Sequence, residues 1–209
     1  RSFRAPTWTE RFYPGPPSVG IGNPDLEPER AWNVDAGVEL QKAAFRFITT
    51  VYTRRASGLI DWARPSTDPE GAWAARNVDS AEFTGLETEI DVYDVAGFRV
   101  RAGGHWLSLT SSSAAGWTSK YALRPRVENT SIAVERAYGI LNGSVRVLRE
   151  RRIGEAAHVL LDARLAADFG WLRLWGDLRN ALDTEYQDIS FNPAPGRSLT
   201  IGAEWRQSR

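Results

Sequence analysis

Nine residues of strict alternation after a proline-rich loop limit what this chain can fold into. Over residues 32–40 every second residue is apolar (Trp32, Val34, Ala36, Val38 and Leu40), and the residues between are polar or glycine. A period of two is that of a β-strand with one apolar and one polar face. In the preceding segment, 22–30, two prolines remove backbone donors and hold the chain extended. The unit predicts a polar loop that leads into an amphipathic strand.

The same alternation recurs along the chain. We predict about ten strands, at residues 1–5, 30–40, 44–62, 77–93, 98–106, 126–135, 138–150, 158–169, 171–180 and 197–206. Short turns near 41–43, 94–97, 136–138 and 168–170 alternate with long links at 6–29, 63–76, 110–122, 150–157 and 181–196. Outer-membrane barrels have short turns at one end and longer loops at the other, and tilted strands of about 9–11 residues cross the bilayer. The pattern therefore predicts an all-β, antiparallel, up-and-down transmembrane barrel.

The charged faces indicate how such strands would be oriented. Over residues 171–180 one face carries Leu172, Leu174 and Leu178, and the other carries Arg173 and Asp177. An arginine that faces hydrocarbon near the bilayer centre costs about 2–4 kcal/mol. We therefore expect the aliphatic face to meet lipid and the charged face to line a wet interior.

Composition excludes some other kinds of protein. Lys plus Arg equals Asp plus Glu, at 26 each, so no global field favours nucleic acid. The absence of cysteine excludes disulfides and thiolate sites within this chain. The mean hydropathy of −0.39 does not argue against a barrel, because lipid-facing and inward-facing residues alternate.

Three passages of the chain have distinctive motifs: Phe3-Arg4-Ala5-Pro6 with the proline-rich loop, Asn77-Val78 with Gly85-Leu86-Glu87, and Asn180 to Tyr186 with Pro195-Gly196-Arg197. Together they resemble TonB-dependent outer-membrane receptors of the vitamin B12 and siderophore type. The residues that carry the resemblance are Arg4, Ala5, Pro6, Asn23, Pro24, Leu26, Pro28, Glu29, Asn77, Gly85, Glu87, Asn180, Asp183, Tyr186, Pro195, Gly196 and Arg197.

The resemblance implies that residues 1–209 are the C-terminal part of a barrel of 22 strands with a plugged lumen. It also implies that a plug and a TonB-pairing segment, both absent from this sequence, belong to the same protein. The expected function is TonB-dependent import of vitamin B12 or a ferric siderophore across the bacterial outer membrane. The expected partners are the TonB complex, the transported ligand, the lipid bilayer and lipopolysaccharide. We expect no nucleic acid partner, cofactor, metal or catalytic residue.

Aromatic residues in or beside the long loops are candidates for contact with a bulky ligand. They are Trp8, Phe12, Tyr13, Trp62, Trp73, Trp117, Tyr186 and Phe191. The alternative is that these rings pack the loops together.

The histidines and the arginine cluster of the chain are not predicted to bind a metal or the transported ligand. His105 and His158 would form a metal site only if their strands were neighbours, which the predicted strand order does not allow. Arg149, Arg151 and Arg152 are expected in an outside loop that is solvated or touches lipopolysaccharide rather than clamping a ligand.

Two other functions are also compatible with the sequence. A passive porin or an adhesin barrel would lack the plug and the TonB-pairing segment. A soluble β-sandwich enzyme or binding module would bury its aliphatic strand faces in a dry core instead of exposing them.

Overall fold

The computed structural model describes residues 1–209 except 17, 79, 112–115, 190–191 and 207–209. Its contacts divide the chain into two compact units, each assembled from several segments. Unit 1 comprises residues 1–36, 51–85 and 107–127, and unit 2 comprises residues 37–50, 86–106 and 128–209.

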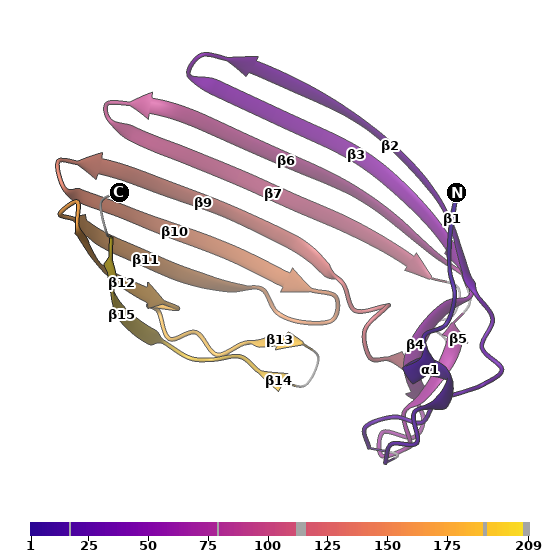
Figure 1. Cartoon of the computed structure of the whole chain (residues 1–209). Helices are drawn as coiled ribbons and strands as arrows, with labels where there is room; N and C mark the ends of the chain where they lie inside the picture. Colours follow the sequence, from indigo (N-terminus) through magenta and orange to yellow (C-terminus); the bar gives the residue numbers. More distant parts are fainter. Residues whose placement is uncertain (17, 79, 112–115, 190–191, 207–209) are drawn as a thin grey trace. The chain divides into compact units, whose positions relative to one another are not determined.

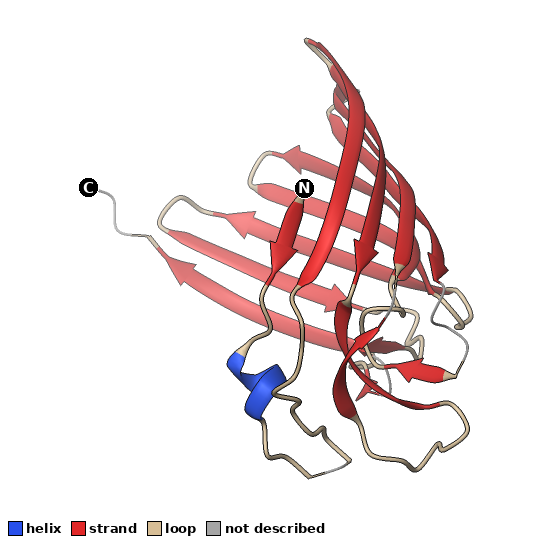
Figure 2. Cartoon of the chain, turned by 90° about the vertical axis from the view of Figure 1, so that its right-hand side faces the viewer, coloured by secondary structure: helices blue, strands red, loops and turns tan. Residues whose placement is uncertain are grey.

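Strands make up nearly all of the regular structure, with one short helix among the described residues (Figures 1 and 2). The elements are β1 (Ser2–Arg4), α1 (Trp8–Phe12), β2 (Glu29–Lys42), β3 (Phe45–Ser57), β4 (Leu59–Pro65), β5 (Ala74–Val78), β6 (Ala81–Val95), β7 (Phe98–Ser111), β8 (Trp117–Ser119), β9 (Arg126–Tyr138), β10 (Leu141–Arg152), β11 (His158–Asp168), β12 (Leu172–Arg179), β13 (Gln187–Ile189), β14 (Asn192–Pro193) and β15 (Ser198–Trp205). No helix in the described part of the chain has the length and apolar character needed to span a membrane.

Ten strands form one sheet in the order β1-β2-β3-β6-β7-β9-β10-β11-β12-β15. This confirms the prediction of an all-β fold with about ten strands joined in sequence order. The registers β1–β2, β7–β9, β10–β11, β11–β12 and β12–β15 are all antiparallel. The remaining strands form a three-stranded sheet, β5-β4-β8, and a two-stranded sheet, β13-β14.

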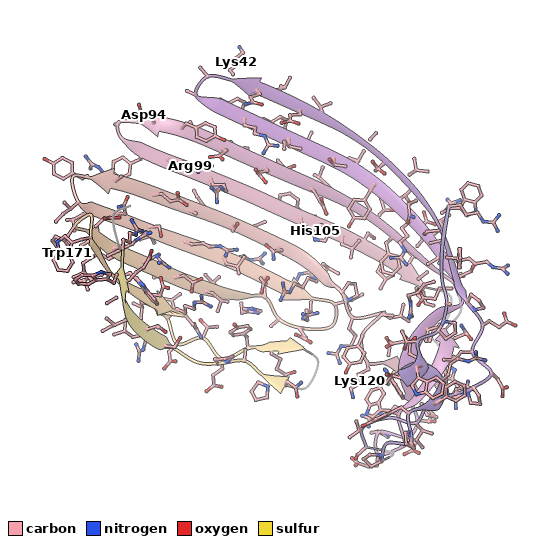
Figure 3. The ribbon with its side chains drawn as sticks, in the orientation of Figure 1. Lys42, Asp94, Arg99, His105, Lys120 and Trp171 are labelled. Carbon is pink, nitrogen blue, oxygen red and sulfur yellow. The ribbon has the colours of Figure 1, made fainter. Side chains whose placement is uncertain are left out.

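Short turns and long links alternate, as the sequence predicts. In unit 2, Lys42, Asp94 and Trp171 each lie at a tight turn at the same end of the strands (Figure 3). The long links hold the additional elements. Thus β5 begins in the predicted link 63–76, β8 lies in 110–122, and β13 with β14 lies in 181–196.

The structure departs from the predicted elements at several places. The strand predicted at 44–62 is divided at Gly58, whose positive φ of 63° ends β3, so that β4 leaves the large sheet and pairs with β5 and β8. The strand predicted at 77–93 is divided likewise into the end of β5 and the long β6. The predicted loop 6–29 contains α1, and β10 continues to Arg152 through the start of a predicted charged loop.

Many large apolar residues on the long strands are exposed. Residues that are directly paired on neighbouring strands lie on the same face of the sheet. In unit 2 the pairs Val145–Ala163 and Ala163–Leu178 therefore belong to one aliphatic face, which extends across β10, β11, β12 and β15. The exposed large apolar residues of these four strands include Val145, Val147, Val159, Leu165, Leu174, Leu199 and Ile201. The dry core that a soluble sandwich would make of these residues is not formed.

Charged residues pair on the opposite face. In unit 2, Arg46 Nε lies 2.9 Å from Glu39 Oε1, and Arg99 Nε lies 2.9 Å from Asp91 Oδ1. Arg164 Nη1 lies 3.0 Å from Asp177 Oδ2. Arg99 and His105, both odd-numbered residues of β7, belong to this face (Figure 3). The long strands that carry these pairs therefore have one aliphatic and one charged face, as the alternation predicts.

The buried apolar clusters of the described residues lie in unit 1. One consists of Ala31, Ala56, Leu59, Ala63, Val78 and Ala81, with Phe83, Leu109, Trp117 and Leu123 packed against it. The second consists of Leu26, Ile60 and Ala75, with Trp62 against it. Both clusters include residues of β4 or β5, so the packed part of this unit surrounds the small sheet.

Candidate functional site

The candidate site is the long-loop end of unit 1, where α1 and the small sheet lie. A capping box begins α1: Glu10 N donates to Thr7 Oγ1 at 3.2 Å, and Thr7 N donates to Glu10 Oε2 at 2.7 Å. Trp8 and Phe12 are one helical turn apart, so their side chains meet, with ring centroids 4.5 Å from each other. Trp8 is 77% exposed, so the helix presents an aromatic pair to solvent.

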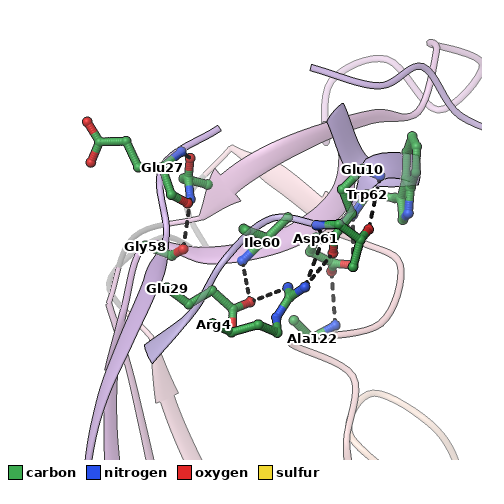
Figure 4. A network of polar contacts seen from close by, with 11 residues as sticks. Arg4, Glu10, Glu27, Glu29, Gly58, Ile60, Asp61, Trp62 and Ala122 are labelled. Atoms are coloured by element: carbon green, nitrogen blue, oxygen red, sulfur yellow. Dashed lines mark hydrogen bonds and ion pairs between the residues drawn. The ribbon is translucent and has the colours of Figure 1, made fainter. Parts of the chain in front are cut away.

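Arg4 fixes this helix to the large sheet (Figure 4). Its Nη1 lies 2.9 Å from Glu10 Oε2 in α1, and its Nη2 lies 2.7 Å from Glu29 Oε1 at the start of β2. Glu29 Oε1 also accepts a hydrogen bond from Ile60 N of β4, at 2.8 Å. One guanidinium therefore joins three elements that are separate in the sequence.

The network controls the charge state of its carboxylates. Burial raises the pKa of Glu29, but the hydrogen bonds from Arg4 and Ile60 N outweigh burial and leave the pKa below its usual value. The pKa of Glu10 is lowered in the same way, because bonds from Arg4 and Thr7 exceed the effect of burial. The two carboxylates raise the pKa of Arg4 in return. All three groups are therefore charged at neutral pH.

Asp61 forms a second centre in the same unit, which the sequence analysis did not identify. Its buried carboxylate accepts hydrogen bonds from the Ser119 hydroxyl and from the backbone N–H groups of Tyr121, at 3.1 Å, and Ala122, at 2.9 Å. Trp62 N also donates to it, at 2.8 Å. These bonds hold the segment after β8 against β4 (Figure 4). Burial raises the pKa of Asp61, and the hydrogen bonds oppose that rise only in part.

The loop aromatics of unit 1 fall into two groups. Trp73, 5% exposed, lies beneath Arg64 and Lys120, at 4.5 and 5.5 Å from its ring centroid. Trp117 and Trp62 pack against the two apolar clusters. Trp8, Phe12 and Tyr13 are exposed, and Tyr13 meets the Trp62 ring edge-on at 6.2 Å. The structure thus places three of the candidates in loop packing and three at the surface.

The other two aromatic candidates belong to the link between β12 and β15. Tyr186 stacks on His158 with ring centroids 4.6 Å apart. Phe191 lies outside the described residues. Whether any of the eight aromatics contacts a ligand stays a prediction.

A polar row crosses unit 2 at the level of His158. His158 Nε2 lies 3.6 Å from Glu150 Oε2, and Asn129 Nδ2 donates to Glu150 Oε1 at 2.7 Å. His105 pairs with Asn129 in the β7–β9 register. The two histidines are thus in one row but on strands separated by β9 and β10. The described residues contain no group of three or more His, Asp or Glu side chains placed to hold a metal ion.

The motif residues of the two later passages brace loops through paired hydrogen bonds. Asn77 accepts from Glu27 N and donates to Glu27 O, both at 2.9 Å, which ties the proline-rich loop to β5. Asn180 accepts from Thr184 N and donates to Thr184 O, again at 2.9 Å. Asp183 Oδ1 accepts from Arg197 N at 2.8 Å. These polar residues act on the backbone of a distant or adjoining loop.

Two further motif positions have steric or turn-forming roles. A Cβ built at Gly85 would lie 2.4 Å from Cζ of Tyr52, so the Tyr52 ring lies over this glycine and would have to move to admit a side chain there. Asn23 Oδ1 accepts from Asp25 N at 3.0 Å, which closes an Asx-turn at the start of the proline-rich segment. Leu26, three residues later, is buried in the second apolar cluster. Glu87 is exposed in β6, and its carbonyl accepts from the Thr49 hydroxyl at 3.2 Å.

Comparison with known sequences identifies a family and two relatives. The sequence model of the family described as "TonB dependent receptor-like, beta-barrel" matches residues 1–207. The vitamin B12 transporter BtuB of Vibrio vulnificus is 29% identical over 104 residues, which is 50% of this chain and 16% of that protein. BtuB of Photobacterium profundum is 33% identical over 86 residues, 41% of this chain and 13% of the relative.

Solved structures agree on the fold. The copper transporter OprC superposes with a TM-score of 0.75 at 15% identity, over 98% of this chain and 35% of that one. The siderophore receptor PirA from Pseudomonas aeruginosa superposes with a TM-score of 0.68 at 14% identity, over 97% of this chain and 34% of that one. The chain therefore spans about a third of the length of these structures, and the B12 transporter alignments cover a still smaller share of the relatives.

Proposed function

We propose, from the premise that the chain belongs to the TonB-dependent receptor-like β-barrel family, that residues 1–209 form the C-terminal part of an outer-membrane transporter barrel. Barrels of this class have 22 strands. The ten strands of the large sheet would supply nearly half of them. The rest of the barrel and the plug would come from residues outside this sequence.

The exposed aliphatic face is the observation that carries the proposal. On β9 this face runs between Glu128 and Arg136, and includes Ile132 and Val134, both exposed. Eight residue steps span roughly 26 Å along a strand, which at the tilt of about 40° in outer-membrane barrels covers roughly 20 Å along the membrane normal, most of the apolar band of about 25 Å. Exposed rings lie beyond Arg136 at the short-turn end, where the Trp171 and Trp205 centroids are 4.7 Å apart. Such rings suit a membrane interface.

The opposite face fits a hydrated interior. Several of its arginines are paired with acidic side chains on a neighbouring strand, as in the Arg164–Asp177 and Arg99–Asp91 pairs. Buried in hydrocarbon, these groups would incur a large desolvation penalty. In a water-filled bore the same pairs stay hydrated and do not incur this penalty.

The transported ligand is proposed to be vitamin B12 or a ferric siderophore. The B12 class is supported by the two relatives named as vitamin B12 transporters, and the siderophore class by the structural likeness to PirA. The exposed rings of Trp8, Phe12 and Tyr13 at the long-loop end would meet the ligand first. Energy would come from the TonB complex, acting through a plug that lies outside this sequence. No bond is made or broken in the ligand.

Uptake by the complete receptor tests this function. The full-length protein is expressed in a host that lacks its own B12 and siderophore receptors, and uptake of radiolabelled cyanocobalamin and of ferric siderophores is measured with and without TonB. We expect uptake of one class that disappears without TonB. Uptake that persists without TonB would instead favour a passive porin, and a folded outer-membrane protein that takes up neither class would contradict the transport proposal.

A further inference from the structure

The aliphatic face of unit 2 changes its chemistry abruptly near the long-loop end of β10. Val145 and Val147 are exposed on this face, and the next two positions of the same face are Arg149 and Arg151. Both arginine side chains are 45% exposed. Arg152 has the opposite parity and belongs to the charged face. The three arginines that the sequence groups together are therefore divided between two surfaces.

Neighbouring strands place an acid, a tryptophan and a valine beside the two arginines. Glu128 of β9 contacts Arg149 Nη1, and its Oε2 lies 3.5 Å from Arg151 Nε. In the registers of the sheet, Glu128 pairs with Trp106, which is exposed, and Arg149 pairs with Val159. A row of Trp106, Glu128, Arg149 and Val159 thus crosses four strands at one level.

The charges of this row do not balance. Two guanidinium groups share one carboxylate, so the cluster retains one net positive charge. Glu128 has a side-chain exposure of only 16% and holds both arginines at the surface of the sheet. Each guanidinium has five N–H donors, and one carboxylate cannot occupy them all. The remaining donors point to an oxyanion that presents several oxygens, such as a phosphate.

The location suggests where that phosphate comes from. The row marks the end of the exposed aliphatic stretch, and beyond Arg152 begins the long link to β11. In the proposed membrane orientation this level is the outer interface, where a tryptophan ring such as that of Trp106 is favoured. The ligand of Arg149 and Arg151 would therefore combine a phosphate with acyl chains that lie along Val145 and Val147.

We propose that Arg149 and Arg151 form a binding site for the phosphate groups of lipopolysaccharide in the outer leaflet. This inference rests on the proposed membrane function. The site is on the opposite face from the charged pairs, so it is separate from the path of the transported ligand. It holds a lipid neighbour of the barrel and takes no part in transport.

The test compares lipids that differ only in phosphate. The full-length receptor is purified from outer membranes in detergent, and binding of lipid A, of dephosphorylated lipid A and of inorganic phosphate is measured by native mass spectrometry. For the wild type we expect lipid A to bind at least about tenfold more tightly than its dephosphorylated form, because charge-assisted bonds to phosphate are lost. The double variant Arg149→Gln, Arg151→Gln should bind both lipids equally weakly.

Arg146 supplies a matched control, since it is an exposed arginine of the same strand but lies on the opposite face. Arg146→Gln should bind lipid A as the wild type does. Equal wild-type binding of the two lipids, or unchanged binding by the double variant, overturns the site. Displacement of lipid A by millimolar inorganic phosphate would show a general anion site and overturn the lipid assignment.

Two readouts separate this inference from the transport proposal. If the double variant to glutamine does not fold, the wild-type comparison of the two lipids still decides the outcome. The double variant Arg149→Lys, Arg151→Lys keeps both positive charges, and we expect it to bind lipid A with intermediate affinity. Ligand uptake is measured on the same variants. Normal uptake with no phosphate preference rejects the lipid site alone, whereas absence of the protein from the outer membrane rejects both proposals.

Discussion

Arg4 Nη2 and Glu29 Oε1 lie 2.7 Å apart, which joins two sequence motifs separated by 25 residues. Both residues belong to the first passage that resembles the receptor family: Arg4 lies near its start, and Glu29 ends its proline-rich loop. The same guanidinium holds Glu10 of α1. The two ends of this passage are therefore joined, and together they position the exposed aromatic helix at the start of β2.

Replacement of Arg4 should release this helix. Arg4→Ala leaves Glu29, whose side chain is 11% exposed, without its cation, and we expect a local cost of about 1–3 kcal/mol. Hydrogen exchange of the α1 amides in the full-length receptor measures that cost. Arg1→Ala is the control, because Arg1 only stacks on Trp32 at 5.7 Å. Equal protection of α1 in both variants would refute the role of Arg4.

The Arg4 network and the Asp61 centre should respond to acid in opposite directions. The pKa values of Glu10 and Glu29 are lowered from 4.5, so their stabilisation is complete above that pH and is lost as the pH falls through the lower folded values. The pKa of Asp61 is raised, so its contribution is present at low pH and is lost as the pH rises through the folded value.

Spin labels can separate the two responses, since this chain has no cysteine to interfere. A label at Thr9 in α1 should become more mobile as the pH falls below 4.5, whereas a label at Tyr121 beside Asp61 should not. Simultaneous loosening of both labels would indicate global unfolding and contradict the prediction.

Replacement of Trp8 should affect ligand binding, whereas replacement of Trp73 should affect the stability of the fold. Trp8→Ala removes an exposed ring and should weaken ligand binding by about tenfold without lowering the melting temperature. Trp73→Ala removes a ring that is 5% exposed and should cost about 3–5 kcal/mol of stability. Calorimetric titration with the ligand identified by uptake, together with thermal melting, measures both. Unchanged affinity in Trp8→Ala would remove this ring from the candidate site.

Gly85 should not tolerate a side chain. The alanine Cβ would overlap the Tyr52 ring, so Gly85→Ala should destabilise by about 1–3 kcal/mol. Combination with Tyr52→Ser should restore much of the loss, which can be followed as the amount of folded protein in the outer membrane. Gly103→Ala is the control, because the nearest atom to its Cβ would be 3.4 Å away. No rescue by the double change would place the cause elsewhere.

An arginine scan of β10 tests which face meets lipid. Val145→Arg puts a charge on the exposed aliphatic face and should cost about 2–4 kcal/mol if this face lies at the bilayer midplane. Ser144→Arg, one residue away on the opposite face, should cost little. Refolding equilibria of the full-length receptor in lipid vesicles compare the two. Equal costs would mean that this face does not contact hydrocarbon.

Strand positions and faces could be predicted because they depend on local spacing. The alternation over 32–40 sets two faces of a strand by geometry alone, and β2 at Glu29–Lys42 agrees with it. The regular lengths of turns and links likewise anticipated the order of the large sheet. These features need no information from distant residues.

The organisation of the long-loop end could not be predicted, because it depends on contacts between distant residues. β4 continues the apolar character of β3, and only the reversal at Gly58 and pairing with β5 and β8 separate them. In the sequence, Asp61 is a single acidic residue within the apolar run Leu59-Ile60-Asp61-Trp62-Ala63. A lone charge in such a run is the one local sign that Asp61 is a buried, hydrogen-bonded carboxylate. Its donors Ser119 and Ala122 come from 58 and 61 residues away in the sequence.

The sequence by itself determined an all-β chain with one aliphatic and one charged face per strand, because side-chain direction alternates with each residue of an extended backbone. Only the tertiary structure decided which loop aromatics are buried, which carboxylates share a cation, and which arginines face outward beside Trp106. Burial and charge pairing depend on residues that the fold brings together from far along the chain, and no local period encodes those partners.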